Sequence, residues 1–170
     1  MRGRGFTLVE LLVVLAVAAI LLTMAVPGYA FLANASRLAA ATNDLMTAVQ
    51  LARSEAIKRG VRVTVCKSGG SAVACDAGAD WQSGWLVFVD AGAQGVVDAG
   101  DVVLWVRDRA LSDVTIVSTN YSRYISYLSN GSSQGSNGLA NGRLEICVQG
   151  NQRDIVVNRV GRPKLENHTC

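Results

Sequence analysis

The chain begins with an apolar stretch that extends from Phe6 to Val26. Its polar interruptions are Thr7, Glu10 and Thr23. Folded as an α-helix, a stretch of this length covers about 31 Å, which is enough to cross the hydrocarbon core of a bilayer. Arg2 and Arg4 precede it, and positive charge marks the flank of a membrane helix that stays in the cytoplasm. We therefore expect residues 6–26 to span a membrane and the remainder to be exported and tethered.

A second helical pattern follows, in which the apolar residues keep to one face. Pro27 predicts a kink or local melting, after which apolar residues recur at steps of three and four. These residues are Leu38, Ala41, Leu45, Val49, Ala52 and Ala56. Lys58 and Arg59 suit the negative end of the helix dipole, and Gly60 suits its C-cap. The pattern predicts one helix over residues 6–60, of which 27–60 are amphipathic.

From residue 61 the hydrophobic period changes from helical to two-residue alternation, which indicates β-strands. The segments with this pattern are 61–66, 85–89, 102–106, 144–148 and 153–159, with weaker ones at 114–118 and 121–128. The Gly-, Ser- and Asn-rich segment 130–142 is expected to be an exposed, mobile loop, and 161–170 a tail. The prediction is an α+β fold, in which a long N-terminal helix packs on a mostly antiparallel β domain over residues 61–170.

Glu10 is a carboxylate inside the stretch that is expected to span the membrane. Such a group costs about 2.5 to 3.5 kcal/mol at the bilayer centre, less near an end, and usually has a function. If the chain were cut between Gly5 and Phe6, the new amine of Phe6 would lie one helical turn from Glu10. Amine and carboxylate could then neutralise each other, within one chain or between neighbouring chains. This pairing would let such helices pack together in lipid and in a polymer.

The run Gly5-Phe6-Thr7-Leu8-Val9-Glu10 resembles the class III signal of type IV pilins and type II secretion pseudopilins. The resemblance implies that residues 1–5 are a leader removed by a prepilin peptidase, that Phe6 is N-methylated, and that Glu10 acts in assembly. A plain membrane anchor and an ordinary secretory signal cut near Ala33-Asn34-Ala35 are the alternatives. An ordinary signal has an apolar core of roughly 7 to 15 residues, shorter than this one, and neither alternative accounts for Glu10.

Two further runs, Ala52 to Ala56 and Trp81 to Asp90, resemble the FimT/GspH family of minor pilins and pseudopilins, FimT- or FimU-like. The resemblance implies a minor pilin that is assembled into, or primes, a type IV pilus; the alternative is a pseudopilin of the type II secretion system. Its expected partners are other major and minor pilins or pseudopilins, the prepilin peptidase and the bacterial inner membrane. The β domain would lie in the periplasm and later at the pilus and cell surface.

The cysteine count changes the picture of the β domain. Four cysteines in an exported domain favour disulfides, and three connectivities are possible. The local one, Cys66 with Cys75 and Cys147 with Cys170, is preferred because it closes one loop and pins the tail. A zinc site with His168 is disfavoured, since no Cys-x-x-Cys spacing occurs.

The net charge of +3 gives no general case for nucleic acid, because Arg2 and Arg4 supply two of these charges. A local excess of positive charge does occur near the carboxyl end, at Arg159, Arg162 and Lys164. The run Val160 to Lys164 resembles the Gly-Arg-x-Arg motif by which FimT-type minor pilins of competent bacteria contact DNA. It departs from that motif in ending on lysine, which lacks the bidentate fork of arginine. Pro163 is expected to hold this segment in a loop, which would point Arg162 and Lys164 at the phosphates of double-stranded DNA.

Other chemistry has little support in the sequence. The segment Asp90 to Asp101 has acidic residues, but Gly92 and Gln94 stand where calcium ligands would be needed, so a glycine-rich hairpin is the better interpretation. The single histidine, His168, lies beside a cysteine, and no nucleophile–base pair is indicated. We expect no enzymatic activity, no cofactor and no metal.

Overall fold

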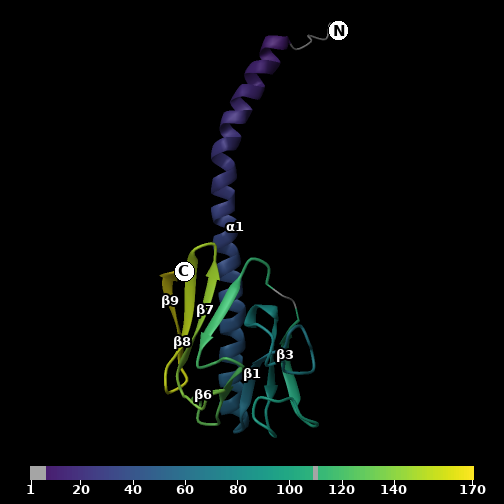
Figure 1. Cartoon of the computed structure of the whole chain (residues 1–170), viewed down its shortest axis with the longest axis vertical. Coiled ribbons are helices and arrows are strands. Elements are labelled where there is room, and N and C mark those ends of the chain that lie inside the picture. The colour runs from purple at the N-terminus through teal and green to yellow at the C-terminus, as the bar shows by residue number, and fades with distance from the viewer. Residues whose placement is uncertain (1–6, 109–110) are drawn as a thin grey trace. The chain divides into compact units, whose positions relative to one another are not determined.

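The computed structural model describes residues 7–108 and 111–170, except for the side chains of residues 24 and 27. The chain divides into two compact units, Met1–Ser36 and Arg37–Cys170, and the second is called the head here. Helix α1, Leu8–Arg59, contributes residues to both units (Figure 1). Its residues 8–36 are called the apolar half, and its residues 37–59 the head half.

The apolar half starts with an N-terminal cap at Thr7. The Thr7 hydroxyl accepts a hydrogen bond from the Glu10 backbone N–H at 3.3 Å, and the Thr7 carbonyl accepts one from Leu11 N–H at 3.1 Å. A side-chain acceptor at this position satisfies a backbone donor that the helix itself cannot pair. The helix then continues without a break through residues 27 and 28, so the local melting expected at the proline does not occur.

The head half presents one face to the core of the head. Its buried residues include all those predicted from the spacing, which confirms that pattern: Leu38, Ala41, Leu45, Val49, Ala52 and Ala56. The helix ends at Arg59, and Gly60 follows with a positive φ of 70° and donates its N–H to the Ala56 carbonyl. Glycine is suited to this left-handed conformation at a helix end.

Sheet A has five antiparallel strands in the order β3-β2-β1-β5-β6. The strands are β1 (Val63–Lys67), β2 (Trp85–Val89), β3 (Val102–Arg107), β5 (Tyr124–Tyr127) and β6 (Ser133–Gly135). A short 3-10 helix, Trp81–Ser83, leads into β2. Every residue of β1 is buried, so the alternating, half-exposed strand expected there is wrong. The loops 68–80 and 90–101 contribute Cys75 and Val97 to a second apolar cluster around Leu86 and Phe88, away from the main core.

Sheet B has four antiparallel strands in the order β4-β7-β8-β9. The strands are β4 (Thr115–Thr119), β7 (Gly142–Val148), β8 (Asn151–Val157) and β9 (Pro163–Thr169). Alternate residues of β7 are buried, as expected for a sheet with one covered face. The tail predicted over 161–170 is in fact a strand along the edge of the sheet, beside β8 (Figure 1). Pro163 is its first residue, a place where a missing N–H can be tolerated.

The main core joins the head half of α1 to one face of each sheet. Leu45 and Val49 of the helix, Trp85 and Ile125 of sheet A, and Ile146 of sheet B belong to this single buried cluster. The head is therefore built around the helix, which both sheets need as an apolar partner.

The segment 130–142 is more ordered than its composition suggested. It contains β6, and Gly131, Ser133, Gly135 and Gly142 are buried. A side chain on Gly142 would begin 2.6 Å from the ring of Tyr121, so the small residue lets the aromatic ring reach the core. Burial raises the pKa of Tyr121 to about 12, which keeps this ring neutral.

Both disulfides follow the local connectivity. Cys66 is bonded to Cys75, and Cys147 to Cys170. The first closes the loop after β1, and the second links β7 to the residue that follows β9. Because β8 lies between those two strands, the second disulfide ties together three strands of sheet B.

Candidate assembly and binding sites

The first candidate site is the beginning of the apolar half. Gly5 and Phe6 lie outside the described residues, whereas Glu10 occupies the first turn of α1 and is exposed. An 18-residue window of this helix has a mean hydropathy of 2.7 with none of its residues buried, and by length and composition it could cross a membrane. Apolar side chains are exposed all round it, as the consecutive residues Leu11, Leu12, Val13 and Val14 show. A helix with no polar face is typical of a membrane span.

The second candidate site is the turn that joins β8 to β9. Asn158 closes this turn twice, because its N–H donates to the Arg162 carbonyl at 3.2 Å and its side-chain oxygen accepts from Arg162 N–H at 2.8 Å. Gly161 has a φ of 76°, and a Cβ there would lie 2.0 Å from the carbonyl oxygen of Gly131. The glycine of the Gly-Arg pair therefore has a packing role.

Arg53 of the head half holds the same turn through its guanidinium group. Its Nε donates to the Gly131 carbonyl at 3.1 Å and its Nη2 to the Val160 carbonyl at 3.4 Å. One guanidinium thus connects the helix to two turns that are distant in sequence. This places Arg162 on a well-braced support.

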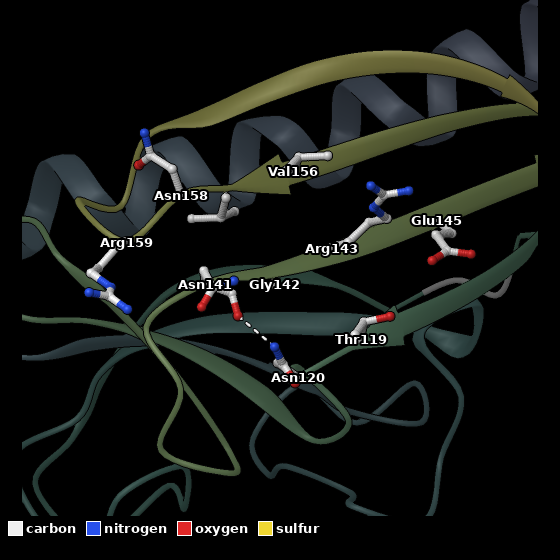
Figure 2. Close-up of a pocket in the computed structure, with 10 residues that line it drawn as sticks. Thr119, Asn120, Asn141, Gly142, Arg143, Glu145, Val156, Asn158 and Arg159 are labelled. Carbon is white, nitrogen blue, oxygen red and sulfur yellow. Dashed lines mark hydrogen bonds between the residues drawn. The ribbon is translucent and has the colours of Figure 1, made fainter.

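The three basic residues predicted to contact DNA differ in their immediate surroundings. Arg162 is exposed and lines a groove beside the helix, together with Gln50 and Ile57. Arg159 lines a different hollow, on sheet B (Figure 2). Lys164 pairs with Glu166, and this hydrogen bond lowers the pKa of the Glu166 carboxyl. Successive residues of a turn and a strand point in different directions, so neighbours in the sequence can have different surroundings.

The hollow in Figure 2 has a volume of about 670 Å³ and lies over β7 and β8. Asn120 donates to the Asn141 carbonyl at 2.8 Å across one end of it. Arg143 points toward it from β7, while also donating to Asp154 at 3.0 Å. The sequence analysis did not select Asn120, Asn141 or Arg143, since their approach depends on the pairing of β4 with β7.

An ionic cluster lies on the face of sheet B that is opposite the main core. Asp154 is fully buried there and accepts hydrogen bonds from Arg143 and from Gln152, the latter at 2.7 Å. His168 Nε2 lies 3.6 Å from Asp154 and 3.7 Å from Glu166. The histidine thus belongs to a network that holds β9 to its neighbours, and a buried carboxylate needs such partners.

In the acidic loop 90–101, the carboxylates accept hydrogen bonds from the loop backbone and from neighbouring side chains. Buried Asp90 accepts hydrogen bonds from Arg62 at 2.8 Å, from Thr64 at 2.6 Å and from Gly95 N–H at 2.8 Å. Asp101 accepts from two backbone N–H groups of the same loop. Within residues 7–108 and 111–170, no group of three or more His, Cys, Asp or Glu side chains is placed to hold a metal ion.

Comparison with known families agrees with this architecture. Residues 41–161 match the family described as type II transport protein GspH. The chain belongs to the GspH family. Residues 1–26 of this GspH-family chain also match the prokaryotic N-terminal methylation motif, the region that contains Gly5, Phe6 and Glu10. The family resemblance stated from the sequence is therefore confirmed.

Solved structures show the same fold. Two crystal structures of the type IV minor pilin FimU from Pseudomonas aeruginosa PAO1, in space groups P21 and P65, are similar to the GspH-family chain at 19% identity. The first has a TM-score of 0.58 and covers 77% of this chain and 89% of FimU; the second has 0.57, with 76% and 92%. A comparison with curated protein sequences gives no match. The pilin-like α+β fold predicted from the sequence is confirmed.

Proposed function

We propose that this GspH-family protein is a minor pilin that is assembled into a type IV pilus or primes its assembly. Residues 1–5 are removed as a leader, residues 6–26 hold the protein in the bacterial inner membrane, and the head lies in the periplasm before reaching the pilus surface. Its partners are the prepilin peptidase and other major and minor pilins. The observation that carries the proposal is an apolar helix, exposed all round, with a carboxylate in its first turn.

The physical basis is the pairing of Glu10 with the amine that cleavage creates on Phe6. An unpaired carboxylate is unfavourable in lipid, so it gains from a cation that a neighbouring helix can supply. In a polymer of such helices, each new amine and each carboxylate can be satisfied between subunits. The protein works by packing and surface presentation rather than by catalysis.

Mass analysis of the mature N-terminus tests this proposal. We expect the protein from the native host to begin with N-methylated Phe6. A mature chain that begins at Asn34 or Ser36 would instead indicate an ordinary secretory signal, and a chain that keeps its first five residues would contradict assembly through Phe6.

The alternative is a pseudopilin of the type II secretion system that acts in protein export. Its helix and head would have the same physical properties, so the phenotype of a deletion strain separates the two. Loss of pili or twitching with normal export supports the pilin, and loss of exported enzymes with normal twitching supports the pseudopilin.

A second candidate function is the capture of double-stranded DNA for uptake during natural transformation. The observation that favours it is Arg162, which is exposed on a braced turn and has no carboxylate partner among the residues that the structure describes. The proposal predicts salt-sensitive binding that is lost when Arg162 and Lys164 are both changed to Gln. Unchanged binding in that double variant would exclude the turn as the DNA contact.

A further inference from the structure

A groove of about 430 Å³ lies between the head half of α1 and the start of β9. Its lining residues are Gln50, Arg53, Ser54, Ile57, Arg162 and Pro163. Apolar side chains are exposed in the segments that form it or adjoin it in sequence: Ile57 is 49% exposed, Val160 60% and Leu165 47%. Leu165 is on the same face of β9 as Pro163, since residues two apart in a strand share a face. The groove therefore offers contact area to an apolar side chain.

The charge of the groove is positive and is not neutralised within the head. Arg53 donates to the carbonyl oxygens of Gly131 and Val160, which are neutral acceptors. Arg162 uses its backbone N–H within the turn. No ion pair of either guanidinium with a carboxylate occurs in the described part of the chain. A carboxylate that entered the groove would gain charge-assisted hydrogen bonds.

The free edge of β9 continues from the groove. Hydrogen bonds from Cys170 N–H to the Gly150 carbonyl and from Asn158 N–H to the Arg162 carbonyl bracket the β8–β9 ladder. Because hydrogen-bonded pairs alternate in an antiparallel ladder, the even-numbered residues of β9 bond to β8. The backbone groups of Leu165, Asn167 and Thr169 then point away from the sheet. β9 is the last strand in sheet B, so these groups face an open edge.

We propose that this groove and the free edge of β9 bind an extended acidic segment of another polypeptide. The main chain of the partner pairs with β9 as an added strand, which is a common mode of peptide recognition. An apolar side chain of the partner covers Ile57 and Leu165, and a carboxylate two residues away, on the same face of the added strand, meets Arg162 and Arg53. Pro163 has no N–H, so the first donor along this edge is Leu165. This contact involves only the head and does not depend on Phe6 or Glu10.

Three observations favour a polypeptide over nucleic acid at this place. Lys164 is already paired with Glu166, and Arg159 lines the hollow on sheet B, so Arg53 and Arg162 are the cations that line this groove. The groove is bordered by exposed apolar side chains, which match a peptide better than a phosphate backbone. An open strand edge offers alternating main-chain donors and acceptors, which another strand can match but which a row of phosphate acceptors cannot.

The test measures binding of short fluorescent peptides to the full chain in detergent micelles. The probe is an acetylated, amidated peptide of repeated Val-Ser-Glu-Ser, in which valine and glutamate lie two residues apart and so share one face of the strand. Its control has glutamine in place of glutamate. Two further versions carry N-methyl groups on one or the other alternate set of backbone amides. Arg162→Gln is the test variant, and Arg123→Gln is the matched control, because Arg123 is an exposed arginine that lines a different pocket.

We expect Arg162→Gln and the glutamine peptide each to weaken binding about tenfold, the loss that one charged hydrogen bond produces. Arg123→Gln should leave affinity within about twofold. One N-methylated peptide should bind and the other should not, since a strand pairs through one edge only. Equal effects of Arg162→Gln and Arg123→Gln, or equal binding of both N-methylated peptides, would overturn the proposal. Binding of duplex DNA that needs Arg162, without binding of the acidic peptide, would also overturn it and support DNA capture.

Discussion

The two halves of α1 share one secondary structure and differ in almost everything else. No described side chain from Leu8 to Ser36 is buried, although most of them are apolar. In the head half, a single face is buried and the other faces are mostly polar, with Ile57 exposed among them. A helix of the first kind needs an apolar environment that the chain does not itself provide, whereas one of the second kind completes a core. The periodicity of the pattern, more than its average hydrophobicity, tells the two roles apart.

The largest expected effect comes from changing Glu10, the carboxylate of the apolar half. Glu10→Ala should leave the protein inserted and cleaved but remove it from sheared pili, because the Phe6 amine loses its counter-charge. Glu10→Asp keeps the charge and should retain part of the incorporation. The measurement is immunoblotting of pilus and membrane fractions; normal amounts of the Ala variant in pili would contradict the assembly role.

One leucine from each half of α1 tests whether that half contributes to the stability of the head. Leu45→Ala should lower the free energy of unfolding of the head by about 2 to 5 kcal/mol, since Leu45 is fully buried. Leu15→Ala removes the same atoms from the apolar half, where Leu15 is 56% exposed, and should leave the unfolding of the head unchanged. Denaturant titrations of the full chain in detergent, followed by tryptophan fluorescence, measure both. Similar losses would mean that the halves are one stability unit.

The turn between β8 and β9, which Arg53 of the head half holds, belongs to the head, and Gly161 tests its packing. Gly161→Ala should cost more than about 2 kcal/mol, because the residue combines a positive φ with the close approach of the Gly131 carbonyl. Gly150→Ala has a similar φ of 85° but open space around its Cβ, so it should cost only about 1 kcal/mol. Thermal unfolding of the two variants separates the strain of the backbone from the clash. Equal losses would remove the packing role of Gly161.

The smallest effect concerns the end of the head half. The hydrogen bond from Arg59 lowers the pKa of the Glu55 carboxyl below its ordinary 4.5. A lowered carboxyl pKa in the folded state stabilises above the unfolded pKa, and this stabilisation is lost as pH falls through the folded pKa. Glu55→Gln should therefore make stability slightly less dependent on pH below about 4.5. Denaturation midpoints over that range measure it, and an unchanged pH dependence would show that the pair contributes nothing.

The sequence predicted those parts of the molecule whose signals are local. The spacing of Leu38, Leu45 and Ala52 identified the buried face of the head half, and the alternation around Ile146 identified β7. The local disulfide pairing also followed from short distances along the chain. Residues 1–6 carry the strongest family signal, yet Gly5 and Phe6 stay predictions because they lie outside the described residues.

The errors arose where distant segments decide the structure. β1 is buried on both faces because loops 68–80 and 90–101 cover the face that its sequence pattern predicted to be exposed to solvent. The segment predicted as a tail forms strand β9 because it pairs with β8. Pro163 removes one backbone N–H donor, at the first residue of that strand only. The groove beside Arg162 depends on Arg53, more than a hundred residues away along the chain. Hydrophobic periodicity alone contains no information on such approaches.

The burial of β1 on both faces also has a consequence for the opening of the head. β1 is the middle strand of sheet A, with a paired strand on each side, and all its residues are buried. Its backbone amides can meet solvent only when the head unfolds as a whole, so their exchange with deuterium should be the slowest in the protein. The strand that the sequence pattern predicted to be half-exposed is thus the strand whose amides should be protected from solvent the longest.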